Sequence, residues 1–294
     1  MRVPLIFLEG KKIPRLLFSI SLKNPKDHQH LLYLMRRLYE EGFSCLDLPT
    51  PHHLQRLKEL RELTEDESLI GFGHIGIENG VFLLGKPIEQ FESKIVSTLI
   101  KNFLPPQWMK KLSPSPKLGE VLTQREIDRI TFDPSRFDEA LSSFHPKETP
   151  FLLMDGIYND WLLTLGRVDL FQDSISKIRQ KGFIPIFSAQ WPTLVLPKAK
   201  PLEVAAYAIP IHPKKSLFDF DQTCEMVKKF DKPIIGLKPF MGKRDLKKLK
   251  TTFSFLFSEL KVYLTIGEVS SEFEMKMAFK GITEIPSFIP FQRT

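Results

Sequence analysis

The sequence has few of the residues that mark a disulfide-bonded or metal-binding protein. Two cysteines occur among 294 residues, Cys45 and Cys224, and no CxxC spacing exists. A pair so far apart in sequence argues against a disulfide framework, a zinc ribbon and an iron–sulfur site. We therefore expect two buried cysteines that stay reduced.

The sequence also lacks a long apolar segment. No apolar run reaches the length of a membrane-spanning helix. The opening residues, MRVPLIFLEGKKIPRL, contain an apolar stretch that is too short for a secretory signal and has no small-residue cleavage site. These features predict a cytoplasmic protein without a membrane partner.

Positive charge is only in mild excess over negative charge. The chain has 42 Lys and Arg residues against 35 Asp and Glu residues, a net charge of +7. Many of the basic residues lie in helix-like stretches such as RLKELREL, and no basic ribbon interleaved with aromatic residues stands out. This pattern indicates a solvated surface, and we do not expect nucleic acid as a partner.

Short apolar segments alternate with amphipathic ones along most of the chain. Eight of the apolar segments read as strands: 16–21, 43–49, 68–76, 151–156, 183–189, 204–211, 232–240 and 261–267. Continuous apolar strands separated by helices indicate a parallel sheet buried on both faces. Eight such units predict a single (β/α)8 TIM barrel over residues 1–294. The alternative, an open doubly wound sheet, is less favoured because no glycine-rich phosphate-binding motif follows the first strand.

One stretch interrupts this alternation after the third strand. Residues 77–133 exceed what one connecting helix needs, and they read as a hairpin at 80–88, a helix at 89–103 and a second helix at 122–130. Loops that follow barrel strands lie on the active-site face. The insertion is therefore predicted to be a lid or a surface for a protein partner, and the alternative is an addition that only stabilises the barrel.

Six segments, in their order along the chain, resemble the aldo-keto reductase family. They are LIFLEGKKIPRLLFSIS, EEGFSCLDLPTPHH, SISKIRQKGFIPIFSAQ, AIPIHP, GLKPFMGK and LTIGEVSSEFEMKM. The resemblance covers nearly the whole chain except the insertion. It implies a barrel whose bottom is closed by an N-terminal β-hairpin, and an oxidoreductase that reduces a small carbonyl compound with NAD(P)H.

The resemblance also implies a set of catalytic positions. They are occupied here by Asp47, His52, His74 and Asp155. Asp47 keeps the residue type of the family, whereas His52 replaces a tyrosine, His74 a lysine and Asp155 a histidine. Histidine titrates near neutral pH, so His52 could act as an atypical proton donor.

These four residues also allow other interpretations. Two imidazoles and two carboxylates could perform acid–base chemistry, or hold a metal ion, without nicotinamide. Their spacing matches no recognised metal motif, so we assign no metal ligand. Each residue could instead have an ordinary role, such as a solvent-facing pair formed by His52 and His53, or a turn or helix-capping aspartate.

The positions that resemble the family's cofactor contacts imply NADP as the cofactor. They are Ser188, Lys238, Gly242, Gly267, Ser270 and Ser271. The chain departs from the family at Ala189 and Ala208, which replace polar residues, and at Val269, which stands where a basic residue meets the 2′-phosphate. Three functions therefore stay open: a carbonyl reductase, a barrel repurposed for metal-assisted or acid–base chemistry, and a binding protein without catalytic activity.

Overall fold

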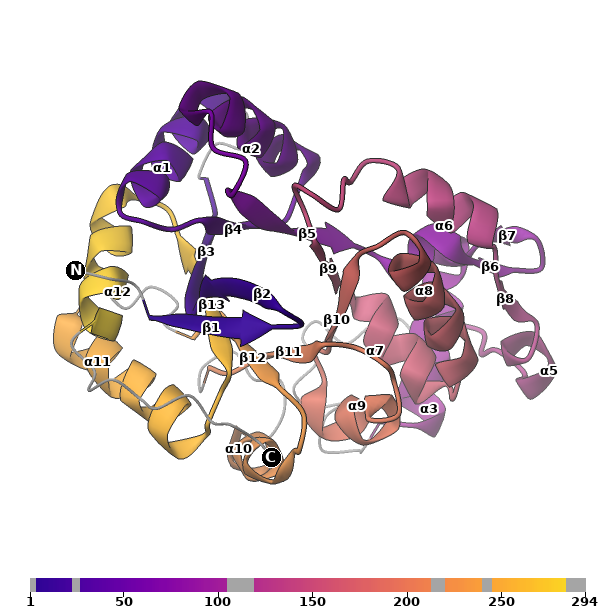
Figure 1. The fold of residues 1–294 in the computed structure, drawn as a ribbon. Helices are drawn as coiled ribbons and strands as arrows, with labels where there is room; N and C mark the ends of the chain where they lie inside the picture. The colour runs from indigo at the N-terminus through magenta and orange to yellow at the C-terminus, as the bar shows by residue number, and fades with distance from the viewer. Residues whose placement is uncertain (1–3, 23–26, 105–118, 213–219, 240–244, 284–294) are drawn as a thin grey trace.

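A closed parallel barrel forms the centre of the molecule (Figure 1). The structure is a computed structural model that describes residues 4–22, 27–104, 119–212, 220–239 and 245–283. Eight of the described strands make up the barrel: β3 (Leu16–Ile20), β4 (Cys45–Leu48), β5 (Ile70–Ile75), β9 (Phe151–Met154), β10 (Ile184–Ser188), β11 (Ala206–Pro210), β12 (Ile234–Leu237) and β13 (Leu264–Val269). The predicted (β/α)8 barrel is thus confirmed, and the open sheet is excluded.

Helices surround the barrel on its outer side (Figure 1). They are α1 (His28–Glu40), α2 (Pro51–Thr64), α6 (Pro134–Leu141), α7 (Ile157–Thr164), α8 (Val168–Gln180), α9 (Pro192–Ala199), α10 (Phe220–Lys229), α11 (Leu246–Ser254), the π-helical turn η3 (Phe255–Glu259) and α12 (Glu272–Thr283). Among the described helices, none is long and apolar enough to cross a membrane.

The predicted hairpin closes one end of the barrel. Strands β1 (Leu5–Leu8) and β2 (Lys11–Pro14) pair in antiparallel fashion. Their side chains Ile6, Leu8 and Ile13 are buried in one cluster with residues of the barrel interior. The hairpin therefore packs its apolar face into the barrel, as Figure 1 shows for its ribbon.

Along each strand, residues two positions apart point to the same face, and this period divides the barrel interior into two zones. Next to the hairpin the inward side chains are apolar, and the rings of Phe72 and Phe151 stack with centroids 4.5 Å apart. Further toward the carboxyl ends, β5 carries His74, and Asp155 directly follows β9. The polar zone therefore lies at the end of the barrel opposite the hairpin.

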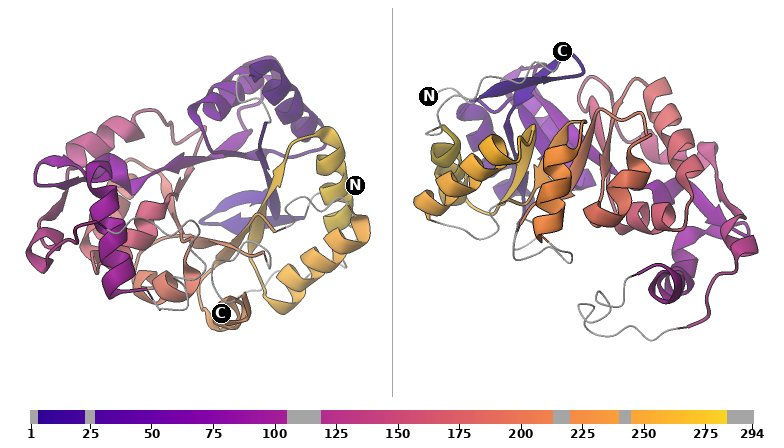
Figure 2. Two further views of the ribbon diagram at one scale, coloured as in Figure 1. Left: turned by 180° about the vertical axis from the view of Figure 1, so that it is seen from behind. Right: turned by 90° about the horizontal axis from the view of Figure 1, so that it is seen from below.

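The residues between β5 and α6 form a small layer of their own. They fold into η1 (Ile77–Gly80), β6 (Val81–Leu83), β7 (Lys86–Pro87), η2 (Ile88–Phe91), α3 (Glu92–Asn102), α5 (Gln124–Ile127) and β8 (Ile130–Phe132). The second view of Figure 2 places the hairpin at one end of the molecule and α3 at the other. This layer thus extends to the end of the barrel that carries the polar zone.

The hairpin predicted in this layer is confirmed, and the bounds predicted for its second helix were wrong. Strands β6 and β7 form the expected hairpin, and Thr123 caps α5 through a reciprocal bond with Glu126. The helix predicted at 122–130, however, ends at Ile127, because Ile130–Phe132 pairs with β6 as a strand. The guanidinium of Arg167 donates to the carbonyl oxygens of Ile127 and Ile130, which satisfies the backbone where the helix ends.

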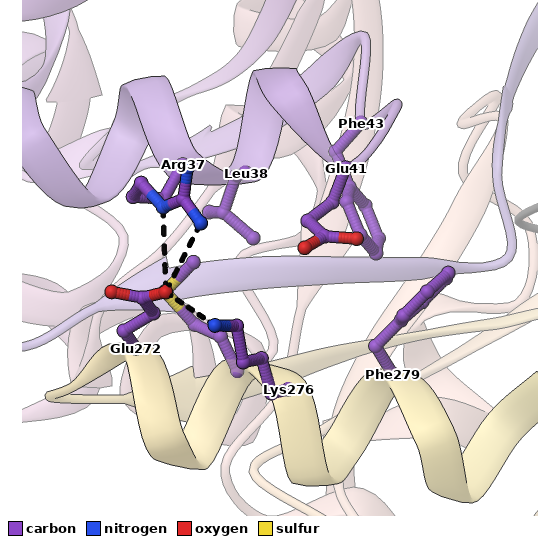
Figure 3. Close-up of a pocket in the computed structure, with 8 residues that line it drawn as sticks. Arg37, Leu38, Glu41, Phe43, Glu272, Lys276 and Phe279 are labelled. Atoms are coloured by element: carbon purple, nitrogen blue, oxygen red, sulfur yellow. Dashed lines mark hydrogen bonds and ion pairs between the residues drawn. The ribbon is translucent and has the colours of Figure 1, made fainter.

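Helices α1 and α12 lie side by side where β13 pairs with β3 and closes the barrel. A groove between them has an apolar floor that includes Phe43 and Phe279, whose rings lie 5.6 Å apart. On its rim Glu272 Oε1 accepts from Arg37 Nη2 at 3.2 Å and from Lys276 Nζ at 2.6 Å (Figure 3). We call these three charged residues the surface cluster.

Candidate active site

Four of the residues predicted from sequence meet at the carboxyl end of the barrel. Asp47 lies in β4, His74 in β5 and Ser188 at the end of β10, while Asp155 directly follows β9. These four strands are neighbours, in the order β4, β5, β9 and β10. Because parallel strands bring their carboxyl ends to the same rim, residues from distant parts of the chain converge there.

His74 lies between two carboxylates. Its Nε2 atom is 2.8 Å from Asp47 Oδ1, and its Nδ1 atom is 3.2 Å from Asp155 Oδ2. The Ser188 hydroxyl donates to Asp155 Oδ1 at 3.0 Å. Ionised carboxylates only accept hydrogen bonds, so both ring nitrogens carry a proton and the ring is an imidazolium. We call this chain of four side chains the His74 network.

The charges in the His74 network stabilise one another. Desolvation disfavours the imidazolium, but the charges and hydrogen bonds of Asp47 and Asp155 outweigh it and raise the pKa of His74 to about 10. Burial alone would raise the pKa of Asp155, yet the bond to His74 and that from Ser188 lower it below its usual range. At neutral pH the network therefore holds a cation between two anions.

Solvent reaches this network mainly at Asp155. The side chain of Asp47 is 2% exposed and that of His74 is 15% exposed, whereas that of Asp155 is 37% exposed. A small molecule that enters from the carboxyl end would meet Asp155 before the other members. Asp155 is therefore the group best placed to contact a ligand.

Two buried residues at the start of α7 support the network from behind. Asn159 Nδ2 donates to the carbonyl oxygens of Met154 at 2.7 Å and Ser188 at 2.9 Å, which ties the ends of β9 and β10 together. The Asp160 carboxylate accepts from the backbone of Gln190 and Trp191, and burial raises its pKa to about 7. Sequence reasoning missed both residues; the signal was two polar residues in the otherwise apolar segment 157–163.

The two neighbouring histidines on α2 have different surroundings. The exposed His52 packs against His28, with ring centroids 4.5 Å apart. His53 is buried: its ring nitrogens bond to Thr50 Oγ1 at 2.8 Å and to the carbonyl oxygen of Ile20 at 2.9 Å, and desolvation lowers its pKa. His53 thus links α2 to the end of β3, and the role of His52 as a proton donor stays a prediction.

The network does not fit a metal ion in this arrangement. Both nitrogens of His74 already bond to carboxylates, so neither offers a lone pair. Across the described ranges, no three His, Cys, Asp or Glu side chains are grouped so as to hold a metal.

The predicted cofactor-binding residues do not fit a phosphate group either. The backbone N–H and the hydroxyl of Ser270 both donate to Glu274 Oε2, at 2.8 and 2.9 Å. The Ser271 hydroxyl accepts from the Glu274 backbone at 3.3 Å, and Lys238 Nζ lies 3.6 Å from Glu268 Oε2. The carboxylates of Glu274 and Glu268 therefore already engage Ser270 and Lys238, where a phosphate would need free donors.

The remaining cofactor positions add little to a binding site. Gly267 is buried within β13 opposite Phe18, and the Ser188 hydroxyl belongs to the His74 network. Gly242 lies outside the described residues.

Comparisons with known proteins agree with the barrel and its connectivity. No protein-family model matches the chain, and no curated protein matches it by sequence. An aldo-keto reductase from Bacillus halodurans, solved in its holo form, superposes with a TM-score of 0.56 at 10% identity over 98% of this chain and 93% of that one.

Two other solved structures superpose on the chain to a similar extent. An aldo-keto reductase from Brucella melitensis gives a TM-score of 0.53 at 12% identity over 98% of this chain and 94% of its own. A thermostable aldo-keto reductase in complex with the inhibitor epalrestat gives 0.52 at 10% identity over 97% and 96%. At such low identity the likeness concerns the fold, and it confirms the resemblance seen in the sequence: the chain has the fold of the aldo-keto reductases.

Proposed function

We propose that the chain is an enzyme that acts on the carbonyl group of a small molecule by acid–base catalysis. The observation that carries this proposal is the His74 network, an ionised group of four side chains at the carboxyl rim of the barrel. Barrels of this kind place their active sites at that rim. The names of the structural neighbours favour an aldehyde or ketone as the substrate class.

The geometry gives each member of the network a distinct role. Asp155 is the solvent-facing carboxylate, and it would accept a proton or a hydrogen bond from the substrate. His74 holds that carboxylate in place and keeps it ionised, while Asp47 fixes His74 from its buried side. A carboxylate of ordinary or low pKa is a sufficient base where an acid partner polarises the substrate carbonyl.

The reaction that the chain's own residues could perform is proton exchange next to a carbonyl. Asp155 would take a proton from the carbon beside the carbonyl group, the C–H electron pair would form the carbon–carbon double bond of an enol, and the carbonyl oxygen would receive a proton. Return of a proton to carbon completes an isomerisation or an exchange with solvent. This chemistry needs no hydride donor.

Hydrogen exchange in D2O tests the proposal. We expect the purified protein to accelerate deuterium uptake by dihydroxyacetone, glyceraldehyde or hydroxyacetone, followed by proton NMR. Asp155→Asn should lower the rate about 100-fold or more, because the amide cannot accept the proton. Asp173→Asn, which changes an exposed aspartate on α8, is the matched control and should keep the rate. Equal rates for wild type and Asp155→Asn, or no acceleration of any probe, would contradict the proposal.

A second candidate is NAD(P)H-dependent carbonyl reduction with an atypical proton donor, as the sequence resemblance implies. Its support is the fold likeness over nearly the whole chain together with a cation at position 74 beside Asp47. Titration with NADPH and NADH, read by nicotinamide fluorescence, separates the two candidates. Micromolar binding would favour the reductase, and absence of binding at millimolar cofactor would leave acid–base chemistry without nicotinamide.

A further inference from the structure

A second carboxyl group lies at this rim, in a niche made by two glycines. Glu78 belongs to η1, which follows β5, and its side chain turns back over the strand ends. A Cβ atom on Gly76 would lie 1.9 Å from Glu78 Oε1, and a Cβ atom on Gly156 would lie 3.6 Å from Glu78 Oε2. Gly76 comes two residues after His74, and Gly156 directly follows Asp155. A larger residue at position 76 would occupy the place of the carboxyl group.

The surroundings of Glu78 favour its protonated form. Its Oε2 atom is buried and has no hydrogen-bond partner among the described residues. Desolvation is the main cause that raises the pKa of Glu78; its own backbone N–H opposes the rise, and the charges of Glu89 and Asp155 add to it. The charge of Glu78 is one of the causes that raise the pKa of Tyr158 on α7, after burial and the charges of Glu92 and Glu89. A neutral carboxyl group avoids the cost of burying an unpaired negative charge beside another one.

Three other ionisable groups, His74, Asp155 and Tyr158, are poor proton donors at neutral pH. His74 holds its protons up to a pKa of about 10, and both its N–H groups point at carboxylates. Asp155 has a lowered pKa and carries no proton. Desolvation and nearby carboxylates raise the pKa of Tyr158 to about 12. Proton transfer to a carbonyl oxygen requires an acid that these three groups do not supply.

We propose that Glu78 is the proton donor of the site, delivering its carboxyl proton to the oxygen of a substrate carbonyl while Asp155 takes a proton from the adjacent carbon. The proposal rests on the proposed function. The O–H bond of Glu78 breaks and an O–H bond forms on the substrate. Once the enol has formed, Glu78 is a carboxylate and Asp155 is a protonated acid. Asp155 then returns a proton to carbon and Glu78 takes one back. Both groups are restored, so no oxidant or reductant is needed.

Two variants test this role by different routes. Glu78→Gln keeps the shape of the side chain but removes its acidic proton, and it should lower deuterium uptake by dihydroxyacetone about 100-fold. Gly76→Ala keeps Glu78 but places a methyl group where the carboxyl group lies, and it should lower uptake to a similar degree. The backbone of Gly76 has φ −88°, which alanine adopts readily, so this change does not strain the main chain. Glu62→Gln, which changes an exposed glutamate on α2, is the control and should keep the rate within about twofold.

The result of this assay separates failure of the inference from failure of the proposed function. Exchange that is lost in Asp155→Asn but kept in Glu78→Gln and Gly76→Ala would overturn the role of Glu78 alone. Exchange that is absent in wild type would overturn the proposed function, and the donor role with it.

A measurement without substrate provides an independent check. Carboxyl carbon NMR of glutamate-labelled protein, assigned with Glu78→Gln, should show that Glu78 titrates above the ordinary range of glutamate. Titration at or below that range would overturn the proposal whatever the exchange assay shows.

Discussion

Two regions of the molecule hold a cation against carboxylates, one inside the barrel rim and one on the outer surface. In the His74 network, an imidazolium lies between Asp47 and Asp155, and its side chain is 15% exposed. In the surface cluster, Glu272 binds Arg37 and Lys276 between α1 and α12, and the Lys276 side chain is 56% exposed (Figure 3). Both regions pair a cation with carboxylates, but water reaches the surface cluster more readily than the His74 network.

This difference decides what each pairing can do. The hydrogen bonds from Lys276, Tyr33 and Arg37 lower the pKa of Glu272 to about 2, but water and salt screen these charges. The His74 network is largely withdrawn from water, so removal of one partner leaves an uncompensated charge. We therefore expect the surface cluster to contribute little to stability, and the network to control both stability and chemistry.

The largest expected effect on stability comes from breaking the buried network. Asp47→Asn removes the fully buried partner of His74 and should lower the free energy of unfolding by about 3 kcal/mol. Urea denaturation at pH 7 measures this change, with Asp173→Asn as the matched surface control. A loss below about 1 kcal/mol, as is usual for a surface substitution, would show that the network is no stronger than the surface cluster.

The pH dependence of stability should distinguish the network in a second way. The pKa of His74 is raised from its ordinary value of 6.5 to about 10, so the folded state binds this proton more tightly than the unfolded state does. The resulting stabilisation is complete below about pH 6.5 and is lost as the pH rises through about 10. Each pKa unit corresponds to about 1.4 kcal/mol, so the change over this window amounts to a few kcal/mol.

Comparison of wild type with His74→Gln isolates this contribution. The glutamine variant should lose the decline in unfolding free energy between about pH 6.5 and 10 that wild type shows. Asp160, whose pKa is raised to about 7, is present in both proteins, and its contribution cancels in the difference. Parallel curves for the two proteins would contradict the charged state assigned to His74.

The smallest effect is expected at the surface cluster. Glu272→Gln removes the carboxylate that joins Arg37 and Lys276, but all three side chains are accessible to water. The midpoint of thermal unfolding should stay within experimental error, at both low and high salt. A clear, salt-dependent drop in this midpoint would show that the surface cluster contributes more to stability than we propose.

The barrel could be predicted from sequence because its eight strands are short apolar runs separated by helices. Helices α7 and α9 were missed for a physical reason: residues 159–164 of α7 are all buried, so no amphipathic pattern marks that helix, and α9 contains Pro197. Helical periodicity arises only where one face meets solvent.

The site could be predicted only in part. The resemblance to the aldo-keto reductases indicated Asp47, His74 and Asp155, and parallel strands bring these positions to one rim. The bond from Ser188 to Asp155 depends on the neighbouring positions of β9 and β10, which sequence does not specify. Glu78 was missed because its niche is formed by Gly76 and Gly156, which come together only in the folded chain.

Nitrogen-15 NMR of histidine-labelled protein would show whether His74 is a protonated imidazole held between two carboxylates. We predict that both ring nitrogens of His74 remain protonated at pH 8 and that the ring titrates at about pH 10. The signal would be assigned with His74→Gln. If the ring titrates near its ordinary pKa of 6.5, or is a neutral tautomer at pH 8, His74 is not the cation of this network.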